Sequence, residues 1–560
     1  DALDAAAARF AAAYLGTIGV DGGPDAEHLR QALEEYERLQ DESARPAVYA
    51  SLVFNADTSP PAHRDLQQRV EQRLTQVRNQ LLFFDLEWLA IDDAAASRLS
   101  DDPALAPYQH YLQAARREKP HVLSEPEERI VNEKDVTGSS AWQRLFAELT
   151  SSLSFPVEID GATQQQTLAA TLTLMRHPDR ALRQRAFESL YAVLETQQQT
   201  LAYIYNTLIQ DKLTMDRLRA YPDPMFSRHL ANEIEPEAVQ AMMSATEASY
   251  DIAQGYFRLK AKLLDLPRLQ IYDQYAPLER AERKISYDEG RAIVLDALGG
   301  FDARFRDIAA EFFEKNWIDA ALRPGKRGGA FCMGYPPSNH PYILCNYTDD
   351  MRDVMTVAHE LGHGIHSVLA RKQTLLNFGP TLPVAETASV FAEMLVFEHL
   401  LAGEQDRATR LGLICGKIED SFATVFRQNV LTRFEQAAFA GRAQGRLTPE
   451  QLGDTWLAAN GAYYGDAVEQ TPGYGRGWSY IPHFINSPFY CYSYVFGELL
   501  VLALYATYRE EGAAFVPKYV ALLEAGGSQS PAAMLAALSV DARDPAFWQR
   551  GLNELRRLVA

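Results

Sequence analysis

The sequence predicts a mostly α-helical fold with a small β-sheet, and three observations lead to this prediction. Apolar residues recur at three- and four-residue spacing in long segments of the first 264 residues, which is the period of an amphipathic helix. The best β-prone segments lie in or directly after a stretch rich in glycine and proline, within residues 324–347. No repeat period, heptad seam or low-complexity tract occurs along the chain. Helix should therefore dominate, with little strand.

Helices are expected throughout the N-terminal part of the chain. The helical period covers three segments there, residues 29–40, 63–90 and 108–119. Pro61 suits the first turn of the second segment. Further on, prolines in residues 177–179 and 220–224 should end helices, and Ser286 has the sequence context of a capping box that opens another.

The small sheet is expected around two segments. Residues 342–347 are β-prone, and residues 328–332 are a possible partner strand. An extended peptide can add to the edge of such a sheet through backbone hydrogen bonds. The candidate substrate-binding residues of this edge are Gly328, Gly329, Ala330 and Phe331. An ordinary structural hairpin explains the same pattern equally well.

Composition excludes several classes of protein. The chain has 560 residues with 54 basic and 74 acidic side chains and a net charge of −20, so its field repels nucleic acid and anionic membranes. The longest strongly apolar run, residues 499–506, is far shorter than the roughly 20 residues of a membrane span, and the N-terminal residues lack the pattern of a signal peptide. Four scattered cysteines without a C-x-x-C pair predict reduced thiols, and hence a cytoplasmic protein.

A His-Glu-x-x-His motif lies in residues 353–367, where it is formed by His359, Glu360 and His363. Residues four apart on a helix lie about 40° apart around the axis and about 6 Å apart along it, so both imidazoles can reach one ion. Glu360 is turned about 100° away, which places it beside a water at that ion. The motif predicts a zinc site with a general base, although a satisfied polar cluster inside a buried helix remains the alternative.

A catalytic zinc site commonly has three protein ligands, so the two histidines leave one to be found. His366 lies about 10 Å along the helix from His359, which excludes it on a continuous helix. Glu386 is the candidate, because it falls in the first turn of a helix predicted to follow two prolines. Favourable interaction with the helix dipole explains an acidic residue there without any metal. Glu393, two turns later on the same side, is a candidate to orient a ligand imidazole.

A histidine and three tyrosines gather near the C-terminal end of the chain, namely His483, Tyr490, Tyr492 and Tyr494. Hydrolysis of an amide needs hydrogen-bond donors for the oxyanion that develops as water attacks, and these side chains can supply them. Aromatic clusters more often serve packing, and that alternative stays open here.

The sequence resembles the thimet oligopeptidase and oligoendopeptidase F family of zinc metallopeptidases, and is nearer to the oligoendopeptidase F branch. Three segments carry the resemblance: HELGHGIHS (residues 359–367), AETASVFAEM (385–394) and WSYIPHFINSPFYCYSYVFGEL (478–499). Weaker similarity extends from about residue 45 to the end of the chain. The motif alone occurs in many unrelated peptidases, whereas these segments in this order do not.

The resemblance implies one zinc ion per chain, bound by His359, His363 and Glu386. It implies that Glu360 is the general base and that His483 and Tyr494 stabilise the transition state. Tyr490 and Tyr492 both remain candidates for the role of a second tyrosine, because this part of the chain departs from the thimet-type pattern.

The fold implied by the resemblance is a gluzincin-type zincin core with a small sheet and two helical lobes around a deep channel that admits short oligopeptides. Residues 1–121 are expected to form an N-terminal helical lobe, and residues 122–560 the zinc peptidase region. The expected activity is cleavage of internal peptide bonds. One rival is an exopeptidase of the dipeptidyl carboxypeptidase type, in which Arg476 would hold the substrate's C-terminus. The other is a peptide-binding protein without activity.

Overall fold

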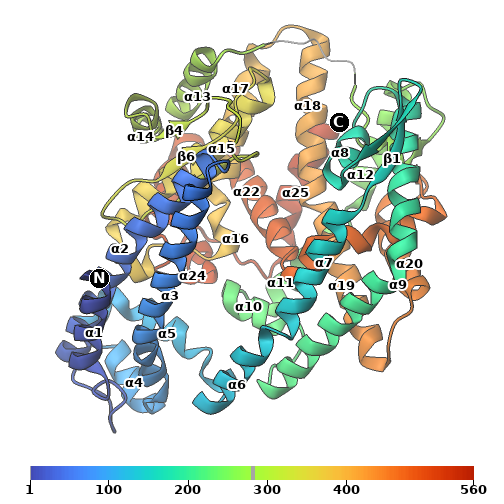
Figure 1. Ribbon diagram of the computed structural model, residues 1–560. Coiled ribbons are helices and arrows are strands. Elements are labelled where there is room, and N and C mark those ends of the chain that lie inside the picture. Colours follow the sequence, from blue (N-terminus) through green and yellow to red (C-terminus); the bar gives the residue numbers. More distant parts are fainter. Residues whose placement is uncertain (1, 279–283) are drawn as a thin grey trace. The chain divides into compact units, whose positions relative to one another are not determined.

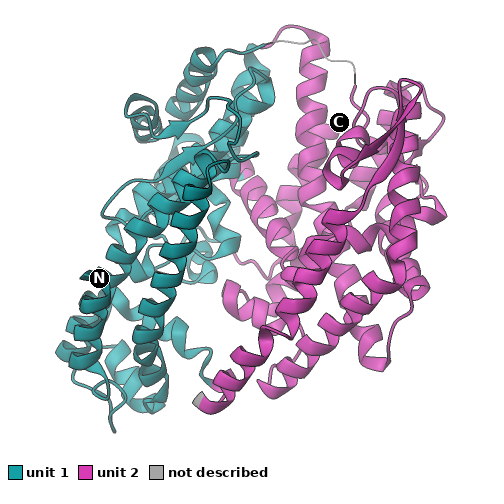
Figure 2. Ribbon diagram, viewed as in Figure 1, with its two compact units in different colours: residues 1–119, 282–403, 507–540 teal, residues 120–281, 404–506, 541–560 magenta. Residues whose placement is uncertain are grey.

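The computed structural model describes residues 2–278 and 284–560 as a mostly helical chain with short strands (Figure 1). By its internal contacts the chain divides into two compact units (Figure 2). Unit 1 comprises Asp1–Lys119, Glu282–Gly403 and Thr507–Val540, and unit 2 comprises Pro120–Ala281, Glu404–Ala506 and Asp541–Ala560. The predicted boundary after residue 121 divides the chain into two continuous segments. Each of the two units instead comprises three separate segments of the chain. That boundary stays a prediction.

Unit 1 holds helices and a three-stranded sheet. Its helices are α1 (Ala2–Tyr14), α2 (Ala26–Ala56), α3 (Pro61–Ala90), α4 (Asp93–Ser100), α5 (Gln109–Arg116), α13 (Tyr287–Phe301), α14 (Ala303–Glu314), α15 (Met351–Leu369), α16 (Leu382–Ala385), α17 (Thr387–Gly403), α23 (Val516–Glu524) and α24 (Pro531–Ala537). Its strands are β4 (Ile318–Asp319), β5 (Phe331–Met333) and β6 (Tyr342–Leu344).

Unit 2 is also helical, with two small pairs of strands. Its helices are α6 (Glu125–Asp135), α7 (Ser139–Ser152), α8 (Leu168–Leu174), α9 (Arg180–Leu218), α10 (Phe226–Asn232), α11 (Pro236–Glu247), α12 (Tyr250–Leu263), α18 (Arg407–Thr424), α19 (Phe426–Gln444), α20 (Pro449–Tyr464), α21 (Pro482–Asn486), α25 (Pro545–Val559) and most of α22 (Tyr492–Glu511). Its strands are β1 (Phe155–Ile159), β2 (Ala162–Gln166), β3 (Leu269–Gln270) and β7 (Val468–Glu469).

The helices predicted within the first 300 residues are confirmed, and so are the breaks between them. The three N-terminal periodic segments form α2, α3 and α5, and α3 begins at Pro61. The prolines after α8 and after α9 lie in the predicted breaks, where they cannot continue a helix. Ser286 is the N-cap of α13, and its side chain accepts a hydrogen bond from the backbone N–H of Glu289. Among the described residues, no helix is both long and apolar enough to cross a membrane.

The sheet of unit 1 has the strand order β4-β6-β5. β4 runs parallel to β6, and β5 runs antiparallel to it, with Cys332 opposite Ile343. The predicted pairing of these two segments is therefore confirmed, but the strand is shorter than expected. Gly329 has a left-handed φ of 81°, so the extended conformation begins only at Phe331. β5 is an edge strand of the sheet, as the peptide-binding hypothesis requires.

Candidate metal centre

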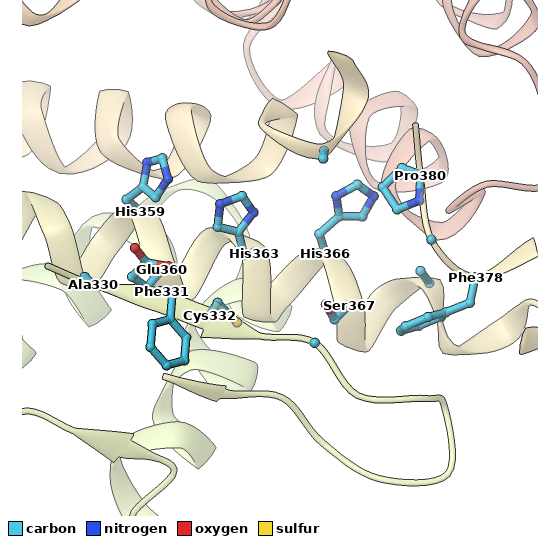
Figure 3. A pocket seen from close by; sticks show the side chains of 14 residues that line it. Ala330, Phe331, Cys332, His359, Glu360, His363, His366, Ser367, Phe378 and Pro380 are labelled. Carbon is cyan, nitrogen blue, oxygen red and sulfur yellow. The ribbon is translucent and has the colours of Figure 1, made fainter. Parts of the chain in front are cut away.

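Helix α15 carries the His-Glu-x-x-His motif and is fixed at its N-terminus by a capping box between Asp350 and Asp353. One face of the helix is apolar and buried, and includes Val354, Leu361 and Ile365. The imidazoles of His359, His363 and His366 project together from another side of the helix (Figure 3). The 3.6-residue period thus places the apolar residues in the core and the histidines at a pocket.

Two glycines in α15 allow other helices to approach the motif closely. A Cβ at Gly362 would lie 2.4 Å from the carbonyl oxygen of Ala388 in α17, and a Cβ at Gly364 would lie 2.6 Å from the ring of Phe312 in α14. Real Cβ atoms do not approach so closely, so only glycine permits this packing. The sequence analysis did not identify Gly362, although a glycine inside a helix is a recognisable sign of close packing.

Close packing of α17 brings Glu386 to the two histidines. Its Oε2 atom lies 3.4 Å from Nε2 of His359 and 3.5 Å from Nε2 of His363. Ligand atoms about 2.0–2.1 Å from a tetrahedral zinc ion lie roughly 3.4 Å apart, so these spacings fit one ion. Among the described residues, these three form the one group of His, Cys, Asp or Glu side chains with the spacing of a metal site. The donor set of two imidazoles and a carboxylate suits zinc.

Each of the three candidate ligands is oriented by a second hydrogen bond. Nδ1 of His359 lies 2.5 Å from the carboxylate of Glu393, and the hydroxyl of Ser389 donates to Oε2 of Glu386 over 2.7 Å. A backbone hydrogen bond links the ring of His363 to Ala385. Burial would lower the pKa of His359, but the hydrogen bond to Glu393 and the neighbouring carboxylates raise it to about 9. Glu393 is thus the hydrogen-bond partner of His359, and its role in orienting a metal ligand stays a prediction.

Replacing Glu393 by glutamine is expected to weaken metal binding by about 10- to 100-fold, because His359 would lose the negatively charged partner that orients its ring. Competition with a chelator measures the affinity. Glu314→Gln is the matched control, since Glu314 is an exposed residue at the end of α14. Equal affinities in the two variants would contradict the role assigned to Glu393.

Glu360 points towards β5 rather than towards the two histidines of the motif. Figure 3 shows its carboxylate beside Ala330 and Phe331. Burial raises the pKa of this carboxyl to about 7, while the charge of His359 and a hydrogen bond from the Cys332 backbone oppose the rise. Glu360 nevertheless lines the same pocket as His359 and His363, so its carboxylate faces the space where a general base would be needed.

A pocket of about 470 Å³ joins the three histidines to the edge strand. Ala330 and Phe331 of the predicted substrate-binding residues line it, together with Cys332, whereas Gly328 and Gly329 do not. His366 lines it too, one turn beyond His363 and apart from the three candidate ligands.

Arg476, the candidate for binding a substrate C-terminus, lies in unit 2 and forms an ion pair with Glu195. Its charge is therefore already balanced by a carboxylate.

Unit 2 brings together three of the four predicted donors. His483 lies at the start of α21, with its Nε2 atom 3.3 Å from the hydroxyl of Tyr494, and the ring of Tyr490 lies 5.7 Å from the His483 ring and 5.2 Å from the Tyr494 ring. Tyr492 is fully buried instead, and its hydroxyl accepts a hydrogen bond of 2.8 Å from Asn232. Of the two tyrosines left open, Tyr490 thus belongs to this cluster.

A buried carboxyl group shapes the backbone next to Tyr490. Phe489 has a left-handed φ of 56°, which is rare for a bulky residue, and its N–H donates to Oε1 of Glu435 over 2.9 Å. Glu435 is fully buried in α19, and its Oε2 atom has no partner among the described residues. Burial raises the pKa of Glu435 to about 8, although the hydrogen bond from Phe489 opposes the rise. No sequence pattern pointed to this contact.

Replacing Glu435 by glutamine is expected to make stability less sensitive to pH. The unfolded chain gives up this proton near pH 4.5 and the folded chain near pH 8, so wild-type stability falls across that window. The glutamine side chain keeps an acceptor for the N–H of Phe489 and does not titrate. The variant's advantage in free energy of unfolding should therefore grow from pH 4.5 to pH 8, to no more than about 5 kcal/mol, and level off above it. Urea unfolding over this range checks the slope, and parallel curves would contradict the assignment.

Comparison with known proteins places this geometry in a family. The family model described as peptidase family M3 matches residues 300–554, and the model described as oligopeptidase F matches residues 87–155. The chain is 30% identical over 549 residues to oligopeptidase PepF of Bacillus subtilis (strain 168), covering 95% of this chain and 81% of that protein. It is 27% identical over 547 residues to an oligoendopeptidase F homolog of Lactococcus lactis subsp. lactis, covering 95% of this chain and 90% of that protein.

Solved structures agree on the fold. A putative peptidase from Chlamydophila abortus matches with a TM-score of 0.86 and 23% identity, covering 95% of this chain and 91% of that one. Oligoendopeptidase-F from Enterococcus faecium matches with a TM-score of 0.73 and 24% identity, covering 100% and 97%. These likenesses confirm the predicted mostly α zincin fold with a small sheet. The chain belongs to peptidase family M3, in its oligoendopeptidase F branch, and is an enzyme of the metalloendopeptidase class.

Proposed function

We propose that this chain is a zinc-dependent endopeptidase that cleaves internal bonds of short oligopeptides. The observation that carries the proposal is the group of His359, His363 and Glu386, with Glu360 next to it and an edge strand alongside. The relatives named oligopeptidase and oligoendopeptidase support oligopeptides as the substrate class.

In the proposed mechanism, His359, His363 and Glu386 hold the metal, and β5 binds the peptide backbone through its free edge. When bound, zinc would supply a Lewis acid for the scissile carbonyl and lower the pKa of a water molecule there to about 7. Glu360 takes the proton of the attacking water and delivers it to the leaving amine. His483, Tyr490 and Tyr494 donate hydrogen bonds to the oxyanion.

The exopeptidase alternative needs a fixed cation for the substrate's C-terminus. Arg476 was the candidate, but its ion pair with Glu195 would have to break before it could bind a carboxylate. This cost favours the endopeptidase. We also propose a cytoplasmic location, in agreement with the four free cysteines, and no nucleic-acid partner, in agreement with the net charge of −20.

Metal analysis together with a peptide assay tests this function. The purified chain is expected to contain about one zinc ion, and to cleave a quenched peptide blocked at both ends as well as the same peptide with free ends. An exopeptidase should fail on the blocked peptide. Absence of bound metal, or cleavage of the free peptide alone, would overturn the proposal.

A further inference from the structure

The turn that leads into Tyr490 has a strained backbone. The N–H of Tyr490 donates to the carbonyl of Ser487 over 3.1 Å, which closes a four-residue turn with Pro488 and Phe489 at its centre. Phe489 has a φ of 56°. Proline in the second position and a left-handed residue in the third are the pattern of a type II turn, whose third residue is normally glycine. A phenylalanine in this position therefore costs free energy that its surroundings must offset.

Helix α19 holds Phe489 at two points. Oε1 of Glu435 accepts a hydrogen bond from the N–H of Phe489 over 2.9 Å. The ring of Phe439, one helical turn further on, lies 4.7 Å from the ring of Phe489 between centroids. Glu435 and Phe489 are both buried, so water does not take the place of either contact. The two contacts fix the backbone and the side chain of the residue directly before Tyr490.

Glu435 is itself an unfavourable residue at this place. Its Oε2 atom is buried and has no partner among the described residues, and an unpaired buried polar atom lowers stability. An apolar side chain of similar length would avoid that loss. A strained turn and an incompletely paired acid thus lie side by side, directly before one of the candidate oxyanion donors. Such unfavourable features gather at functional sites, where the geometry that they impose is needed.

The turn determines where the Tyr490 ring lies. Its centroid is 5.7 Å from that of His483, with 29° between the ring planes, and the ring of Tyr494 meets it edge-on at 5.2 Å. The guanidinium of Arg228 lies over the same ring, 5.5 Å from its centroid. A change in the backbone before Tyr490 would move the ring out of these contacts. The position of the phenol hydroxyl therefore depends on the turn, and through the turn on Glu435.

We propose that Glu435 is a positioning residue for the reaction, because its hydrogen bond to Phe489 holds the turn in the conformation that presents the hydroxyl of Tyr490 to the oxyanion. Glu435 acts only through Tyr490, and Tyr490 is the residue that touches the reacting atoms. The inference rests on the proposed peptidase function. It also gives a reason for the occurrence of a buried acid beside a left-handed phenylalanine.

A double-mutant cycle on a quenched peptide blocked at both ends tests this role. Glu435→Leu removes the acceptor and is expected to lower kcat by about tenfold or more, but by no more than Tyr490→Phe does, with a smaller change in KM. In the Tyr490→Phe background the same substitution should lower kcat by less than about twofold, because the hydroxyl that Glu435 positions is already absent. Glu435→Gln keeps an acceptor for the N–H of Phe489 and should retain at least half of the wild-type kcat.

Tyr250→Phe is the matched control for the loss of stability. It also removes one buried hydrogen bond to α19, the bond of 3.1 Å that Asn429 donates to the hydroxyl of Tyr250, and this bond involves none of the turn residues. Thermal melts give the temperatures at which each variant is folded, and there the control should keep the wild-type kcat. If the leucine variant does not fold, Glu435→Asp takes its place in the cycle, since it keeps an acid but withdraws the acceptor by one methylene group.

Full kcat in the folded Glu435 variant that lacks the acceptor would overturn the positioning role. An equal loss of kcat with and without the Tyr490 hydroxyl would also overturn it, because Glu435 would then act on the fold and not through Tyr490. Full kcat in Tyr490→Phe would do the same. A wild type that does not cleave the peptide would instead overturn the proposed function.

Discussion

Glu360→Gln is expected to lower kcat on a quenched oligopeptide by about 10²- to 10⁴-fold, which is the usual contribution of a positioned general base. Glutamine has nearly the same shape and can still accept the hydrogen bond from the Cys332 backbone, but it cannot take a proton from water. The three candidate ligands stay in place, so zinc content and affinity should not change. Stopped assays with product quantification give kcat, and metal analysis of the same sample gives the occupancy.

Glu314→Gln controls for the change of one acid to its amide in the same unit, on a surface away from the pocket. It should match the wild type in kcat and in zinc content. If Glu360→Gln retained more than half of the wild-type kcat, the proposed base would be wrong. If it lost zinc as well as activity, Glu360 would have to be counted among the residues that hold the metal.

The part of the site that lies on one helix was predictable from the sequence. The helical period fixes the relative positions of His359, Glu360 and His363, and it excluded His366 as a ligand without any knowledge of the fold. In the structure the three candidate ligand atoms lie within 4.8 Å of one another, and His366 is not among them. Their role as metal ligands stays a prediction.

The position of Glu386 was less accessible to sequence reasoning. A pattern of apolar residues predicts that a segment is helical. It does not predict how the preceding loop orients that helix relative to α15. The single helix expected to begin at the prolines is divided into α16 and α17, and Glu386 lies at the junction rather than within a first turn. Its approach to the histidines depends on Gly362, which removes the side chain that would separate the two helices. Only the tertiary packing shows this.

Contacts between distant segments were predicted least well. Glu435 and Phe489 are 54 residues apart, and neither belongs to a motif. Their hydrogen bond stabilises the left-handed backbone conformation of Phe489. Bulky residues rarely adopt this conformation, so the local sequence does not predict it. The start of β5 was also predicted wrongly. The composition of residues 328–332 predicts a strand from residue 328, but the left-handed conformation of Gly329 delays its start.

Tyr494→Phe is expected to lower kcat by about 10²- to 10³-fold, the usual loss when one oxyanion donor is removed. Its hydroxyl pairs with His483 in the cluster that also contains Tyr490, and the proposed mechanism uses this hydroxyl only as charge develops on the carbonyl. KM should therefore change much less than kcat. Tyr490→Phe is expected to lower kcat in the same direction, because its ring belongs to the same cluster.

Tyr492→Phe separates catalysis from packing, since it deletes the same atom two residues away. The hydroxyl of Tyr492 lies 3.0 Å from Nδ1 of His229 and 2.8 Å from Nδ2 of Asn232, so its loss leaves buried polar atoms unpaired and should lower the free energy of unfolding by about 1–3 kcal/mol. At temperatures where this variant is folded, kcat should stay near that of the wild type. Thermal melts and kcat measured on all three variants decide the assignment. A large loss of kcat in Tyr492→Phe with little loss in Tyr494→Phe would reverse the roles of the two tyrosines, because the donor must be the hydroxyl whose removal slows the chemical step.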